Sequence, residues 1–367
     1  MAVRVFINGR FATQRQTGVQ RFARQVVAAL DRVLAAPEHA GLRERTTLLV
    51  PPRGEATLPA LRHIAVRRGG LFGGGYAWEQ IDLPRLACGG VLLDLCNLGP
   101  LAKRRQVVVV HDATLFVSPE SFSRTFRLAY RVLVPLLGRR ARQVMTISRF
   151  SRDEISRWYG LPAEHIGLCG ESGEHIRDVP AETSVLDHAG LAGHPYFLAV
   201  GVGSPNKNVG LVREAFARAG LAETRLVLTG SRNPRVHPGA EPPAGERVLA
   251  LGQVSDGALR ALYEHALALV YPSRYEGFGL PPLEAMCCGC PVVISDQPAL
   301  MEVAGAAGAA LVCGMDDADG LAAQLTRLAR EPALRTALAE RGLAHAARFR
   351  WEDTARVLLE RCLAAAA

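Results

Sequence analysis

The chain lacks several features that would place it outside ordinary folded proteins. No run of about 18 apolar residues is free of charge, so the sequence offers no membrane-spanning helix. The first residues, Met1 to Gly9, read as a buried strand and lack the architecture of a signal peptide. Charged residues make up 21% of the chain and hydrophobic residues 49%, which excludes intrinsic disorder. We therefore expect a globular, cytoplasmic protein.

The sequence also lacks a metal-binding pattern. Of the eight cysteines, Cys287, Cys288 and Cys290 lie close together, but no second Cys/His pair follows at ligand spacing. Small buried thiols in a reducing compartment are the preferred interpretation. We expect no metal and no other cofactor.

A nicotinamide-binding fingerprint is incomplete as well. Gly201 and Gly203 begin a G-x-G-x-x-G pattern, but Asn206 stands where the third glycine is required. This argues against a nicotinamide dehydrogenase. Lys207, at the expected start of the next helix, is instead placed to neutralise a diphosphate, with a solvated lysine as the alternative reading.

What is present is an alternation of short apolar runs with amphipathic stretches, which is typical of parallel sheets covered by helices. The 367 residues suit two domains. We expect an N-terminal Rossmann-like domain at 1–185, a C-terminal one at 190–349, and a terminal helix over about 350–367 that packs back on the first. Residues 179–195 read as the linker. The expected strands are Val3–Ile7, Thr47–Val50, Val91–Asp94, Val107–Val110, Gln143–Thr146, Tyr196–Val200, Arg225–Leu228, Val248–Leu251, Ala268–Val270, Val292–Ile294 and Ala310–Val312.

Charge is divided unevenly between the two halves. Residues 1–185 have a balance of +10 and residues 186–367 one of −2. The basic clusters at 103–105 and 139–142 contribute to this difference. A basic half suggests an anionic partner such as a membrane surface or a lipid-linked diphosphate. An arginine-rich composition without any partner is the alternative, and the motifs below give no reason to expect a nucleic acid.

The segment from Arg274 to Val293 carries the most specific signal. Glu276 and Glu284 are eight positions apart, with Gly-Phe-Gly after the first and Pro-Pro at the expected helix start. A glycine loop before a helix N-terminus suits a phosphate, because the free N–H groups and the helix dipole both favour an anion. Carboxylates beside it can accept hydrogen bonds from sugar hydroxyls. This pattern predicts a nucleotide-sugar site.

Two further residues and one loop each have both a functional and a purely structural interpretation. His111 ends a valine-rich run, where it could contact a substrate hydroxyl or be satisfied by backbone. Gly18 precedes a long amphipathic stretch and is either an anion-facing helix start or an ordinary loop glycine. The glycine-rich loop from Gly69 to Trp78 could clamp an acceptor or be a disordered surface loop.

Together, Glu276-x7-Glu284, Lys207 and His111 resemble the retaining glycosyltransferases of the GT-B fold, family 4. The Asn8-Gly-Arg and Thr17-Gly-Val stretches and Val-Val-His-Asp are similar to bacterial exopolysaccharide and O-antigen mannosyltransferases of that family. The resemblance covers nearly the whole chain. It implies two Rossmann-like domains facing across a cleft, with the donor nucleotide on the second and the acceptor on the first.

The resemblance also implies roles for individual residues. His111 would contact the donor sugar near the reacting carbon, and Glu276 would hold a hydroxyl of that sugar. The other residues would bind the donor: its diphosphate (Gly18, Lys207), its phosphate and sugar through backbone (Gly277, Phe278, Gly279, Leu280), its ribose (Glu284) and its base (Val254, Asp256).

One position departs from the family pattern. Many members have an arginine five residues before the lysine, where this chain has Val202. Arg274 is one possible replacement for the missing cation.

The resemblance implies metal-independent transfer of a hexose with retention, and GDP-mannose is the preferred donor. The acceptor would be a glycan, free or lipid-linked, met at the inner face of the plasma membrane. A UDP-sugar donor, a nucleotide-sugar epimerase or phosphorylase, and a non-catalytic nucleotide-binding subunit remain alternatives.

Overall fold

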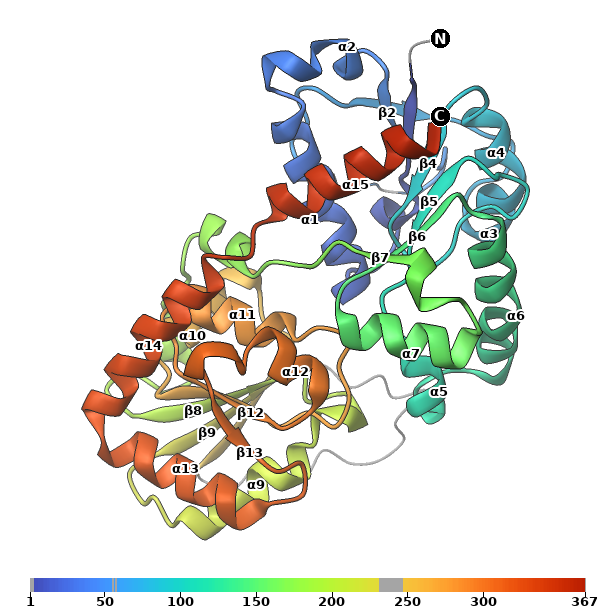
Figure 1. Cartoon of the computed structure of the whole chain (residues 1–367). Coiled ribbons are helices and arrows are strands. Elements are labelled where there is room, and N and C mark those ends of the chain that lie inside the picture. The colour runs from blue at the N-terminus through green and yellow to red at the C-terminus, as the bar shows by residue number, and fades with distance from the viewer. Residues whose placement is uncertain (1–2, 55, 57, 231–246, 367) are drawn as a thin grey trace. The chain divides into compact units, whose positions relative to one another are not determined.

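The structure, a computed structural model, describes residues 3–54, 56, 58–230 and 247–366, which form two α/β units (Figure 1). Unit 1 spans Met1–Ala113, Arg124–Glu171 and Trp351–Ala367. Unit 2 spans Thr114–Ser123 and Ser172–Arg350. None of the described helices is long and apolar enough to cross a membrane.

The sheet of unit 1 is wholly parallel and has seven strands in the order β3-β2-β1-β4-β5-β6-β7. The chain thus builds outward from β1 on one side and then returns to add β4 on the other, which is the Rossmann arrangement. The strands are β1 (Val5–Asn8), β2 (Thr46–Val50), β3 (Ala65–Arg68), β4 (Val91–Asp94), β5 (Gln106–Val109), β6 (Gln143–Thr146) and β7 (Ile166–Leu168).

Unit 2 repeats this arrangement with six parallel strands in the order β10-β9-β8-β11-β12-β13. The predicted α/β fold with two Rossmann-like domains is confirmed. Its strands are β8 (Tyr196–Val200), β9 (Arg225–Thr229), β10 (Val248–Gly252), β11 (Ala268–Tyr271), β12 (Val292–Ser295) and β13 (Leu311–Cys313).

Helices cover both sheets. In unit 1 these are α1 (Gly18–Val33), α2 (Ala40–Arg43), α3 (Gly75–Ala77), α4 (Leu83–Leu86), α6 (Arg124–Arg140), α7 (Arg149–Tyr159) and α15 (Trp351–Ala366). In unit 2 they are α5 (Thr114–Val117), α8 (Ser184–His188), α9 (Val209–Ala219), α10 (Asp256–His265), α11 (Leu280–Cys287), α12 (Pro298–Val303), α13 (Ala318–Arg330) and α14 (Pro332–Ala346).

The last helix, α15, belongs to unit 1 although it ends the chain. It packs along α1 and against β4 and β5 (Figure 1). Trp351, Leu358 and Leu359 are buried in this contact. Each such side chain stabilises the fold by about 1.5–3 kcal/mol, so apolar burial anchors the helix to unit 1.

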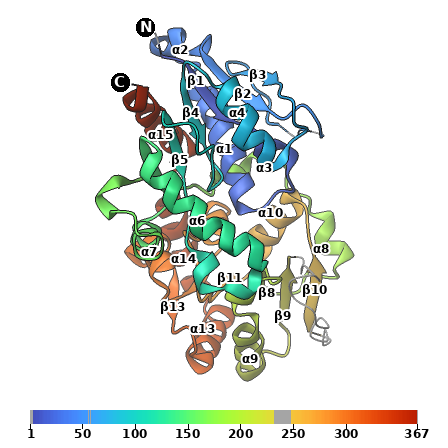
Figure 2. The same cartoon turned by 90° about the vertical axis from the view of Figure 1, so that its right-hand side faces the viewer.

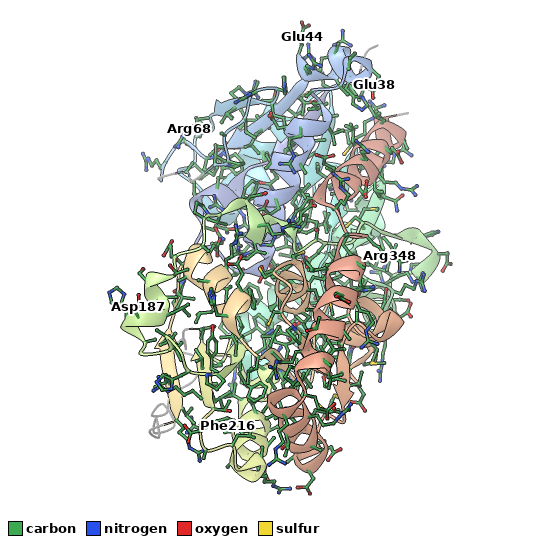
Figure 3. The ribbon with its side chains drawn as sticks, turned by 90° about the vertical axis from the view of Figure 1, so that its left-hand side faces the viewer. Glu38, Glu44, Arg68, Asp187, Phe216 and Arg348 are labelled. Carbon is green, nitrogen blue, oxygen red and sulfur yellow. The ribbon has the colours of Figure 1, made fainter. Side chains whose placement is uncertain are left out.

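Residues 179–195, which the sequence suggests as a linker, lie within the larger segment of unit 2, Ser172–Arg350. The helix α8 lies within this stretch, with Leu186 buried and Asp187 pointing outward (Figure 3). The Glu182 N–H donates to Gly257 O at 3.0 Å, which ties the stretch to α10. Its proline and glycine content reflects turns packed on unit 2.

Candidate functional site

In both sheets the strand order reverses beside the first strand, between β1 and β4 and between β8 and β11. Loops at the carboxyl ends of strands that flank such a reversal form the usual ligand-binding crevice of open α/β sheets. The loops after β8 and β11 contain Lys207 and Glu276, and His111 follows β5. The predicted site residues are thus divided between the two units.

The backbone requires glycine at two places around the β8–α9 loop: at Gly201 within the loop, and at Gly230, which follows β9 and packs on it. Gly201 has φ +76°, and Gly230 has φ +121° with its missing Cβ only 3.0 Å from the Gly201 Cα. Two hydrogen bonds then join this loop to the one after β11: Asn206 Nδ2 donates to Tyr275 O and the Arg274 N–H donates to Asn206 O, both at 2.8 Å. The two loops therefore form one connected surface.

Lys207 and Glu276 meet where these loops join. Lys207 Nζ lies 2.6 Å from Glu276 Oε1 and also donates to the hydroxyl of Tyr271. The ammonium is 4.8 Å from the centre of the Tyr271 ring. Burial, and then the Glu276 charge, raise the pKa of Tyr271 well above its usual value, so the phenol stays neutral. The lysine side chain keeps 17% exposure, and its charge can reach an anionic ligand.

Residues 277–280 lead into α11. Gly279 precedes the helix with φ +106°, and a Cβ there would meet Leu300 Cδ2 at 2.6 Å. Pro281 and Pro282 occupy the first turn, where their missing N–H groups cost nothing. Phe278 is buried with its ring edge-on to that of Phe349, 6.1 Å between centroids.

Glu284, on the same helix, is enclosed within unit 2. Its side chain is 5% exposed, Tyr263 Oη donates to Oε2 at 3.1 Å, and His175 Nε2 lies 3.0 Å from Oε1. Burial, followed by the Glu284 charge, raises the pKa of Tyr263 well above its usual value. Both carboxylate oxygens of Glu284 therefore have a polar neighbour within unit 2. The ribose role of Glu284 stays a prediction.

In unit 1, His111 is buried at the end of β5. Its Nε2–H donates to Leu95 O at 2.9 Å, which leaves Nδ1 as the nitrogen for any other contact. Nδ1 lies 3.6 Å from Glu171 Oε1. The ring also meets Phe22 edge-on, with centroids 4.7 Å apart at 88°.

Gly18 is the first residue of α1, one turn before Phe22, so this helix start and His111 belong to one region of unit 1. Thr17 and Gln20 close the helix start with a capping box. A Cβ on Gly18 would meet nothing within 4 Å. Packing thus gives no reason for a glycine here, and its place beside a diphosphate stays a prediction.

The remaining predicted donor residues lie elsewhere on unit 2. Val254 and Asp256 follow β10, the edge strand, and Asp256 begins α10 after the N-cap residue Ser255. Arg274, the suggested replacement for the cation missing at Val202, pairs its guanidinium with Asp316. Its backbone joins the Lys207 loop, but its charge is already partnered.

A buried polar cluster, not predicted from the sequence, lies at the β1–β4 reversal of unit 1. Asn8 Nδ2 donates to Glu79 Oε1 at 2.9 Å and to Asp94 Oδ1 at 2.8 Å, and Arg10 Nε lies 3.1 Å from the same Glu79 oxygen. All four residues are buried. Burial is the main cause that raises the pKa of Asp94 well above its usual value. One amide thus links two buried carboxyl groups.

The glycine-rich loop of unit 1 is folded around a buried tryptophan. Trp78 Nε1 donates to Gly69 O at 2.7 Å, and the Phe72 N–H donates to Asp82 Oδ2 at 2.8 Å. Tyr76 is exposed, with its ring 4.5 Å from the Arg10 guanidinium carbon. Leu71 and Phe72 of the same loop are exposed as well, and contact of the loop with an acceptor stays a prediction.

A metal centre and a second ligand pocket are two other kinds of site to consider. In the described part of the chain, no three His, Cys, Asp or Glu side chains gather closely enough to hold a metal ion. A hollow of about 570 Å³ lies at the amino ends of β6 and β7, lined by residues 138–144 and 160–166. We do not assign it to the ligand, because ligands of such sheets bind at the carboxyl ends.

Two Rossmann-type units, with a lysine–carboxylate pair at the strand reversal of the second, define a protein of the GT-B class. Residues 188–345 match the family described as "Glycosyl transferases group 1". The O-antigen chain mannosyltransferase B of Escherichia coli is 36% identical over 272 residues, covering 69% of each chain. RfbU, an O-antigen chain mannosyltransferase of Salmonella typhimurium, is 31% identical over 54% of each. The chain belongs to the group 1 glycosyltransferase family, as the resemblance predicted.

Solved structures agree on the fold. The sucrose-phosphate synthase of Thermosynechococcus elongatus matches over all of both chains with a TM-score of 0.72 and 20% identity. HepE of Anabaena, solved with UDP and glucose, covers 98% of this chain and 99% of its own, with a TM-score of 0.69 and 18% identity. At these identities the likeness concerns the fold alone.

Proposed function

We propose that this glycosyltransferase moves a hexose from a nucleotide sugar onto a glycan acceptor, free or lipid-linked, in polysaccharide biosynthesis. The preferred donor is GDP-mannose. The names of the two relatives, both O-antigen mannosyltransferases, support this choice of sugar and of acceptor class.

The observation that carries the proposal is the Lys207–Glu276 pair. A partly exposed ammonium beside a carboxylate, at the strand reversal of a Rossmann sheet, suits a donor with a diphosphate next to a sugar. The ammonium would take the phosphate charge, and Glu276 would accept a hydrogen bond from a sugar hydroxyl.

The proposed transfer retains the configuration of the sugar and needs no metal. The bond from the sugar C1 to the phosphate oxygen breaks, and a bond from the acceptor oxygen to C1 forms on the same face. The acceptor proton passes to the departing diphosphate. Lys207 stabilises the charge that develops on that diphosphate, so the chain contributes chiefly positioning and electrostatic stabilisation. His111 would contact the sugar near C1.

We also propose that α6 contacts an anionic membrane. Leu128, Val132 and Leu136, spaced four residues apart, are all exposed along one face of this helix, which lies at the front of Figure 2 as a ribbon. The helix carries five arginines and no acidic residue. An apolar stripe flanked by cations is typical of helices that lie in a membrane interface. Lys103 is not included, because it donates to Ala87 O and Gly90 O.

The donor is tested by a thermal-shift series with GDP-mannose, UDP-glucose, UDP-galactose, UDP-GlcNAc and the free diphosphates. A ligand that binds the folded chain raises its melting temperature by mass action. GDP-mannose should give the largest shift, and mannosyl transfer to a glycan should follow. A larger shift with a UDP-sugar would favour that donor, and conversion of the sugar without transfer would indicate an epimerase.

A further inference from the structure

Apart from the short excursion at 114–123, the chain passes between the units at two places, Glu171 to Ser172 and Arg350 to Trp351. We call these the first and second crossings. Residues at each crossing contact predicted site residues within their own unit.

In unit 1, a residue at the first crossing contacts His111 directly, and a residue at the second crossing contacts it through Phe22. Glu171, the last residue before the first crossing, has its carboxylate 3.6 Å from His111 Nδ1, and both side chains are buried. Trp351, the first residue after the second crossing, packs edge-on against Phe22 with centroids 5.8 Å apart. Phe22 in turn packs edge-on against the His111 ring. The imidazole is therefore held from both crossings.

In unit 2, residues near both crossings contact the segment 278–284. His175 Nε2 lies 3.0 Å from Glu284 Oε1. Gly173 packs so closely on this helix that a Cβ would come within 2.5 Å of the Glu284 nitrogen. From the second crossing, Phe349 packs against Phe278.

The crossings are also joined to each other within each unit. In unit 2 the Ser172 hydroxyl donates to Phe349 O at 2.7 Å. In unit 1 the Thr354 hydroxyl donates to Gly170 O at 3.5 Å. These two hydrogen bonds hold the crossings next to each other on each side.

We propose that the two crossings position predicted donor-binding residues within each unit, with Glu171 orienting His111 in unit 1 and His175 orienting Glu284 in unit 2. These are positioning residues, because each acts through a residue predicted to touch the donor. The proposal rests on the proposed function for the roles of His111 and Glu284. One backbone segment of five residues, 171–175, supplies the partners of both.

The first test compares His175→Phe, which removes the N–H, with His175→Gln, which can present an N–H near the Nε2 position. GDP and UDP are titrated by calorimetry, and Asp178→Asn, exposed on the same short helix (Glu174–Asp178), is the matched control. Affinity for the nucleotide that the wild type binds should fall about tenfold in the Phe variant, since a buried carboxylate loses a polar partner. The Gln variant should stay within about threefold. Equal affinities in both variants would overturn the role of His175.

The second test uses Glu171→Ala and Glu171→Gln in a donor-saturation assay. It tests the positioning proposal at Glu171 even if His175→Phe does not fold. The Ala variant should lower kcat about tenfold at unchanged donor KM, and Gln should recover most of it. A loss confined to thermal stability would indicate a merely structural residue and overturn the proposal. A wild type that binds nucleotide but transfers no sugar would contradict the proposed function. The calorimetric comparison of the His175 variants would still test the positioning role of His175. A wild type that binds neither nucleotide would overturn both.

Discussion

Lys207 and Glu276 are 69 residues apart in the chain and form an ion pair of 2.6 Å between the loops that follow β8 and β11. The pair joins a cation suited to a diphosphate with an anion suited to a sugar hydroxyl. Each partner holds the other in place while the donor is absent. Their functions should therefore separate on substitution.

Glu276→Gln should leave GDP affinity within about threefold of the wild type, or raise it, because the variant removes a negative charge beside the phosphate site. Transfer from GDP-mannose should fall at least about 100-fold, since the sugar loses a charged acceptor in the transition state. Calorimetry and initial rates measure the two effects. Glu340→Gln, on the exposed face of α14, should change neither. Normal transfer by the Glu276 variant would remove this residue from the site.

Gly279→Ala should loosen the loop that precedes α11. The positive φ and the 2.6 Å approach to Leu300 Cδ2 both oppose a Cβ, at a cost of about 1–3 kcal/mol. For domains of this size each kcal/mol lowers the melting temperature by about 2–4 °C. We expect weaker GDP binding as well. Gly41→Ala, in an exposed helix where a Cβ meets nothing, should be neutral or stabilising. An unaltered melting temperature in Gly279→Ala would count against the strained loop.

The membrane proposal for α6 predicts salt-sensitive binding to vesicles that contain an anionic phospholipid. Leu128→Asp and Val132→Asp should each reduce the sedimented fraction, because each adds a negative charge to the apolar stripe. Val66→Asp, on the exposed edge strand β3, is the matched control and should sediment like the wild type. If all three variants bind alike, or if the wild type does not bind at low salt, α6 is not a membrane surface.

Asp94→Asn should stabilise unit 1 at high pH. Because burial raises the pKa of Asp94 well above 3.8, the folded chain keeps a proton over a range of pH in which the unfolded chain has released it. Stability therefore falls as the pH rises from about 4 through the raised pKa. Asparagine mimics the protonated acid and removes this loss.

The difference in melting temperature between Asp94→Asn and the wild type should consequently widen from pH 5 to pH 8. Thermal unfolding across that range measures it, with the exposed Asp187→Asn as control. A difference that shrinks as the pH rises would mean that Asp94 is ionised in the folded chain.

The sequence predicted all six strands of unit 2 and five of the seven strands of unit 1, but not β3 and β7. Val91–Asp94 and Gln143–Thr146 match the structure because parallel strands inside a sheet read as apolar runs. The missed strand β3 is exposed along its whole length, and β7 contains a glycine between its two apolar residues, so neither forms an apolar run. Residues 179–195 read as a linker because packed turns and linkers share a composition rich in proline and glycine.

For the candidate site, the sequence predicted Lys207 and Glu276, which the structure brings together, but not the side chains that hold the predicted residues. Tyr271 ends a buried strand and reads as an ordinary core residue. His175 lies in a short turn without periodicity, and its contact with Glu284 depends on how η6, the 3₁₀ helix Glu174–Asp178, packs against α11. Such partners are set by tertiary packing, which local patterns do not contain.

The most direct test of the account is calorimetric titration of GDP-mannose into the wild type and Lys207→Met, with Arg330→Met on the exposed end of α13 as a charge-matched control. The account predicts that the wild type and Arg330→Met bind with equal affinity. Lys207→Met should bind at least about tenfold more weakly, because a charge-assisted contact to the diphosphate is lost. Equal affinity in all three proteins would contradict the assignment of the site.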